Sequence, residues 1–124
     1  MRRWIETAWT DRSGTTAVEF ALVSPVFIAL IVGMLALCLC LFLSGSLQYA
    51  VEDAARCASV RTTICNDPSA TVAYAQSRYF GPSKPTFTYT AAACGNSVSA
   101  SINYVAQLGL TQVSIPFTAT ACFP

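Results

Sequence analysis

A single carboxylate, Glu19, lies at the start of a long apolar run, and Gly14 lies five residues before it. From residue 20 to Leu43 the chain has no charged residue, and Ser24 carries the only hydroxyl group of that stretch. A carboxylate that enters hydrocarbon costs up to about 2.5–3.5 kcal/mol at the bilayer centre, and a positively charged partner would offset this cost. The spacing alone leaves two interpretations equally open: a glutamate that pairs with an amine of a neighbouring chain, or an interfacial glutamate that ends a membrane span.

Thiol chemistry is the second candidate, because the chain has six cysteines. Cys38 and Cys40 lie inside the apolar run, where we interpret them as small hydrophobic residues. The other four follow the run and are disulfide candidates: Cys57, Cys65, Cys94 and Cys122. Four cysteines in a small domain behind an anchor predict two disulfides in an oxidising compartment, whereas the alternative is four buried thiols. Three pairings are possible, and we favour Cys57–Cys65 with Cys94–Cys122, which would tie a helix end to the next segment and join two strand ends.

The composition excludes several classes of function. The chain has no histidine, so metal sites and proton transfer at neutral pH lose their commonest side chain. The formal net charge is +1, which does not favour nucleic acid as a partner. No Cys-x-x-Cys pair, nucleophile elbow or phosphate-binding loop is present. We therefore expect no enzyme activity, no cofactor and no metal.

The apolar run is long enough to cross a membrane. About 20 apolar residues span a bilayer core of about 30 Å, and we place the span at about residues 20–43. Arg2, Arg3 and Arg12 precede it, which predicts a cytoplasmic amino terminus with the remainder of the chain on the other side. Pro25 lacks a backbone donor and predicts a kink in the spanning helix.

Two other interpretations of the run are weaker. A secretory signal could be cut after Ser46, but its apolar core would be much longer than the usual 7–15 residues. Cys38 or Cys40 could mark a lipoprotein, but each follows a leucine where a small residue is required. Length therefore favours a membrane anchor.

Helical periodicity continues beyond the span. An apolar stripe recurs at intervals of three and four residues and consists of Leu47, Ala50, Val51, Ala54 and Ala58. Glu52 and Arg56 lie on another face with the spacing of a helical ion pair. One helix is therefore predicted over residues 15–60.

The remaining residues, 61–124, predict a small head. Asp67 and Pro68 have the types of an N-cap and a first helical residue. Three later segments alternate apolar and polar residues and predict antiparallel strands, joined through Gly95-Asn96 and a loop from Gln107 to Thr111. The predicted fold class is α+β: a long amino-terminal helix whose amphipathic half covers a small antiparallel sheet, with one short extra helix.

Residues 12–60 resemble a known family. The matching features are Gly14 and the following Thr-Thr-Ala-Val-Glu-Phe, the apolar run, and the stretch Gln48-Tyr49-Ala50-Val51-Glu52-Asp53-Ala54-Ala55-Arg56. They are similar to the TadE-like proteins, minor pseudopilins of the Tad (Flp) pilus system. The pattern does not separate TadE-like from TadF-like members.

The resemblance implies a maturation step and an assembly role. A prepilin peptidase would cut between Gly14 and Thr15, which would remove the leader, residues 1–14, and make Glu19 the fifth residue of the mature chain. Glu19, next to Phe20, would then pair with the terminal amine of a neighbouring subunit. The implied partners are the peptidase, other pilin or pseudopilin subunits, the assembly machinery of the bacterial inner membrane, and the lipid bilayer.

The expected function is that of a minor pseudopilin required to assemble an adherence pilus, with its head in the periplasm or outside the cell. The alternative is a signal-anchored binding module that is never cut at Gly14. The two differ in whether Gly14 and Glu19 are needed for maturation and assembly.

Overall fold

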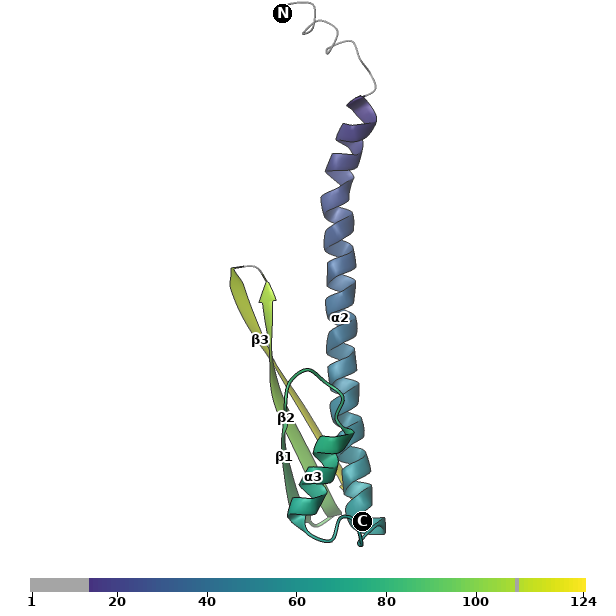
Figure 1. Cartoon of the computed structure of the whole chain (residues 1–124), viewed down its shortest axis with the longest axis vertical. Helices are drawn as coiled ribbons and strands as arrows, with labels where there is room; N and C mark the ends of the chain where they lie inside the picture. Colours follow the sequence, from purple (N-terminus) through teal and green to yellow (C-terminus); the bar gives the residue numbers. More distant parts are fainter. Residues whose placement is uncertain (1–13, 109) are drawn as a thin grey trace, which may run out of the picture. The chain divides into compact units, whose positions relative to one another are not determined.

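The computed structural model describes residues 14–108 and 110–124. Of the predicted leader, residues 1–14, only Gly14 is described; the three arginines lie outside the described residues. The chain divides into two compact units, Met1–Cys38 and Leu39–Pro124, which are described separately. The described elements are two helices, α2 (Gly14–Val60) and α3 (Pro68–Arg78), and three strands, β1 (Thr86–Ala92), β2 (Gly95–Leu108) and β3 (Thr111–Phe123) (Figure 1). The predicted α+β class is confirmed.

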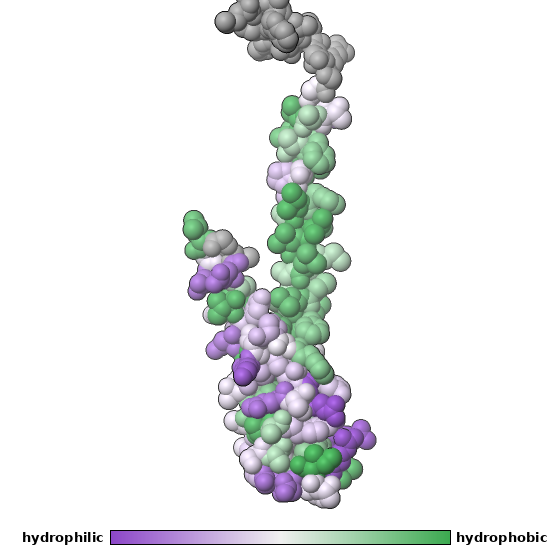
Figure 2. All heavy atoms as spheres, in the orientation of Figure 1, coloured by the Kyte–Doolittle hydropathy of each residue, from purple (hydrophilic) through white to green (hydrophobic). Residues whose placement is uncertain are grey.

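The first unit contains the apolar half of α2. Its large apolar side chains from Val18 to Leu37 are 41–73% exposed, and Figure 2 shows them as a largely hydrophobic surface. Among the described residues, α2 is the one helix long and apolar enough to cross a membrane. The helix passes through Pro25 without a break, so a kink there stays a prediction.

The second unit is a two-layer α+β head. The carboxyl-terminal half of α2 covers one face of the sheet, and α3 packs beside it (Figure 1). The predicted stripe supplies four fully buried residues, Leu47, Ala50, Val51 and Ala54, whereas Ala58 is only half-buried. Their partners in the core include Phe87, Val98 and Ala119, one from each strand. Burial of this apolar face against the sheet is the main term that holds the head together.

The sheet is antiparallel with the order β1-β2-β3. Phe87 pairs with Ala100, which in turn pairs with Ala119. These three paired residues form one row across the buried face of the sheet. The next row, Thr88, Ser99 and Thr120, lies on the opposite face, as the period of two requires. Pro116 is exposed on β3, an edge strand, where its missing N–H does not interrupt the sheet interior.

The predicted position of the turn between the first two strands, Gly95-Asn96, was wrong by two residues. Ala92 pairs with Gly95, so the turn is Ala93-Cys94 and Gly95 already belongs to β2. Gly95 has φ +118°, and a Cβ atom there would collide with the backbone of Phe123 and Pro124. The glycine is needed because another strand end approaches it closely, which a local turn pattern does not reveal.

The short helix begins where Asp67 and Pro68 predicted. The Asp67 carboxylate accepts hydrogen bonds from the Ala70 N–H at 2.7 Å and the Ser69 hydroxyl at 2.6 Å. The bond from Ser69, then that from Ala70, lowers the pKa of Asp67 below its ordinary 3.8. Because the folded-state pKa is lowered, the ionised cap stabilises the head fully above the ordinary pKa of 3.8. This contribution is lost as the pH falls through the folded-state pKa.

Two disulfides close the head. Cys57 is bonded to Cys65 and Cys94 to Cys122, which is the favoured pairing. The first joins the last turns of α2 to the segment before α3, and the second joins the β1–β2 turn to the end of β3. The remaining cysteines, Cys38 and Cys40, are free thiols.

Removal of the second disulfide should destabilise the head more than removal of the first. The Cys94–Cys122 link closes a loop of 28 residues and the Cys57–Cys65 link one of 8, so chain entropy predicts losses of about 3.5 and about 2.5 kcal/mol. We expect a Cys94→Ala/Cys122→Ala variant of the full-length protein in detergent to melt roughly 15–25 °C below the wild type, as followed by tyrosine circular dichroism. The matched Cys57→Ala/Cys65→Ala variant is the control, and the same loss in both variants would contradict the loop-length argument.

Candidate functional site

The residues predicted to act in processing and assembly lie at the amino-terminal end of α2. Gly14 is its first residue, and no atom lies within 4 Å of the position that a Cβ would take there. Thr15 and Glu19 are exposed and lie one turn apart, on the same face of the helix. Phe20 follows with 73% of its surface exposed. Solvent or a partner can therefore reach every side chain of this group.

Glu19 has no ion pair or hydrogen bond to another described residue. A chain that began at Thr15 would carry a cationic amine one helical turn from this carboxylate. Both groups would then be presented on one face, at the border of the apolar surface. In such a chain, an amine of opposite charge on a neighbouring copy would offset the desolvation of the carboxylate.

A polar cluster in the head joins α3 to α2. The Tyr74 hydroxyl donates a hydrogen bond to the Asp53 carboxylate at 2.9 Å and accepts bonds from Arg78 at 2.8 Å and Arg61 at 3.1 Å. Arg78 also forms an ion pair with Asp53 at 3.1 Å. The hydrogen bond with Tyr74 is the main cause of a raised Arg78 pKa, so this guanidinium stays charged. Arg78 and Asp53 pair their opposite charges, and Arg61 is held by the Tyr74 hydroxyl, so the cluster ties α3 and the residue after α2 to the helix.

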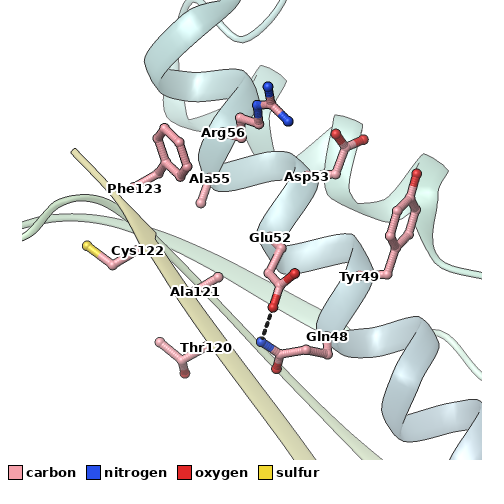
Figure 3. A pocket seen from close by; sticks show the side chains of 10 residues that line it. All are labelled: Gln48, Tyr49, Glu52, Asp53, Ala55, Arg56, Thr120, Ala121, Cys122 and Phe123. Atoms are coloured by element: carbon pink, nitrogen blue, oxygen red, sulfur yellow. Dashed lines mark hydrogen bonds between the residues drawn. The ribbon is translucent and has the colours of Figure 1, made fainter.

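A pocket of about 550 Å³ lies between α2 and the edge of β3 (Figure 3). Its walls are residues 120–123 of β3 and, from α2, Gln48, Tyr49, Glu52, Asp53, Ala55 and Arg56. Sequence reasoning missed this pocket because nothing in the local pattern places the end of β3 beside this face of α2. No group of three or more potential metal ligands occurs among the described residues.

The predicted Glu52–Arg56 ion pair is wrong. The Glu52 carboxylate instead accepts a hydrogen bond of 2.7 Å from the Gln48 amide, and no ion pair joins it to Arg56 in the part of the chain that the structure describes. Both arrangements use the four-residue spacing of a helix, and an exposed helical ion pair is worth only about 0.3–0.5 kcal/mol. Because the ion pair would add so little stability, the hydrogen bond from the neighbouring Gln48 amide can replace it.

The described elements define a class of protein: an α+β head whose first helix is long and, in its amino-terminal half, apolar on all sides. The family model described as TadE-like protein matches residues 14–56, so the chain is similar to that family over this segment. The match begins at Gly14 and includes Glu19, the apolar run and four of the five residues of the apolar stripe, all except Ala58. No curated protein and no solved structure matches the chain.

Proposed function

We propose that the protein is a minor pseudopilin of a Tad-type pilus, cut by a prepilin peptidase between Gly14 and Thr15. The observation that carries the proposal is the TadE-like segment, whose first residue is Gly14 and whose apolar helix leaves its large side chains exposed. An apolar surface of this length requires lipid or other apolar helices to cover it. A pseudopilin uses both, first as a membrane-held precursor and then in a bundle of helices.

Maturation would change the charge at the helix end. The cut removes the leader, with Arg2, Arg3 and Arg12, and leaves an ammonium group at Thr15. The precursor would be held in the inner membrane by α2 with its amino terminus in the cytoplasm, since positively charged flanks stay on that side. The head would fold in the periplasm, where its two disulfides can form.

During assembly, Glu19 would set the axial register between neighbouring helices. Its carboxylate would pair with the Thr15 amine of an adjacent pilin or pseudopilin subunit as the helices leave the bilayer and pack together. Desolvation in the packed helices strengthens such a pair and penalises a displaced one. The role is structural, in an adherence pilus, and the protein acts as the substrate of the peptidase.

The test is the intact mass and amino-terminal residue of the membrane-extracted protein, from cells with and without their prepilin peptidase. We expect a chain that begins at Thr15 only when the peptidase is present. A chain that keeps its leader in both strains would contradict the proposal and favour the uncut, signal-anchored module. A chain that begins at Leu47 would instead identify the apolar run as a long secretion signal.

A further inference from the structure

The β2–β3 hairpin extends beyond the rest of the sheet. β1 pairs with β2 only as far as Ser101, whereas residues 102–108 of β2 pair with β3 alone. We call the described residues 102–108 and 110–117 the free hairpin. An isolated two-stranded ribbon is marginally stable in water, so we expect the free hairpin to pack against another surface.

The free hairpin continues the apolar face of the sheet without any charge. Tyr104 pairs with Ile115 and Ala106 with Val113, in the same phase as the core residue Ile102. Val113 is 44% exposed, and Leu110, at the closed end, is fully exposed. After Lys84 the sequence contains no Asp, Glu, Lys or Arg. The free hairpin could therefore enter a lipid interface without desolvating a charged side chain.

The base of the hairpin is held at the carboxyl-terminal end of α2. The Asn96 amide donates to the Ser59 hydroxyl at 2.9 Å, and that hydroxyl donates to the Phe123 carbonyl at 3.1 Å. From this base the hairpin runs back along the head-covering part of α2, toward the amino-terminal side of the helix (Figure 1). Its closed end therefore points toward residues 39–43, the last residues of the apolar run and part of the same compact unit.

Its length is sufficient to reach the bilayer surface. From Asn96 to Leu108 a strand rises about 40 Å, at about 3.3 Å per residue. From Ser59 back to Leu43, where the apolar run ends, α2 rises only about 24 Å. The closed end therefore reaches the level of Leu43 even when the strands are tilted by about 50° from the helix axis.

We propose that the free hairpin is a second membrane contact, with Leu110 inserted in the interface of the bilayer that α2 spans. This inference rests on the membrane anchoring in the proposed function, and not on processing or pilus assembly. The occupant is lipid because the free hairpin carries no charge and its closed end reaches the level of Leu43, the last residue of the apolar run. Gln107 and Gln112, paired across the hairpin, would lie among the headgroups.

The first test uses tryptophan fluorescence of the full-length protein in phosphatidylcholine–phosphatidylglycerol vesicles. Leu110→Trp is made in a Trp4→Phe/Trp9→Phe background, and Thr88→Trp, on the exposed opposite face of the sheet, is the matched control. Lipids brominated in the acyl chains should quench the tryptophan at 110 at least about twofold and leave the control unquenched. Quenching at neither position, in protein that floats with the vesicles, would overturn the hairpin contact and leave the anchor intact. Protein that does not float would overturn both.

The second test avoids the preference of tryptophan for interfaces. In wild-type protein in nanodiscs of the same lipids, a spin-labelled lipid should broaden the methyl signals of Leu110 but not those of Val60, which is 65% exposed at the far end of α2. Unbroadened Leu110 signals would contradict the proposal, whatever the tryptophan variant shows.

Discussion

A Gly14→Glu variant should remain at its full precursor mass in cells that contain the peptidase. The proposed cut would place a residue without a side chain before the scissile bond, and a charged side chain there should reduce cleavage at least about tenfold, which corresponds to about 1.36 kcal/mol of transition-state binding. The intact mass of membrane-extracted protein measures this directly. Folding does not explain such a loss, because a Cβ at Gly14 meets no atom within 4 Å.

Gly45→Glu is the matched control. Gly45 also lies in α2, and a Cβ there also has nothing within 4 Å, so the two variants receive the same side chain in similarly open surroundings. We expect the control to be cut as the wild type is. Cleavage of the Gly14→Glu variant at the wild-type position would contradict processing at this glycine.

Glu19→Gln should separate maturation from assembly. The variant keeps Gly14 and Thr15, so we expect a chain that begins at Thr15. Its amount in sheared pili should fall by roughly 100-fold, because a neighbouring ammonium left unpaired in the packed helices costs about 2.5–3.5 kcal/mol. Quantitative mass spectrometry of the sheared fraction, relative to the membrane fraction, provides the measurement.

Glu52→Gln serves as the control for this loss. It makes the same isosteric change at an exposed glutamate of α2, in the head and outside the apolar run. Normal assembly of the control with failed assembly of Glu19→Gln would assign the effect to the carboxylate at the helix end. Wild-type incorporation of the Glu19→Gln variant would show that Glu19 only ends the span.

The elements governed by short-range physics could be predicted from the sequence. An uncharged run from residue 20 to Leu43 has to be helical in a bilayer, since a helix satisfies its own backbone hydrogen bonds. Asp67 and Pro68 set the start of α3 because the cap and the first turn involve only neighbouring residues. Alternating residues predicted all three strands, because burial of one sheet face imposes a period of two.

Only the tertiary structure decided how distant segments meet. The turn at Ala93-Cys94 follows from the register of β1 on β2. The need for glycine at position 95 and the pocket beside β3 both depend on where residues 120–124 lie. The spacing of Glu52 and Arg56 was correct for an ion pair, yet Gln48 provided the partner, because exposed helical contacts differ by only a few tenths of a kcal/mol. Periodicity shows which face of an element is buried, but contacts between elements arise from long-range packing, which no local pattern encodes.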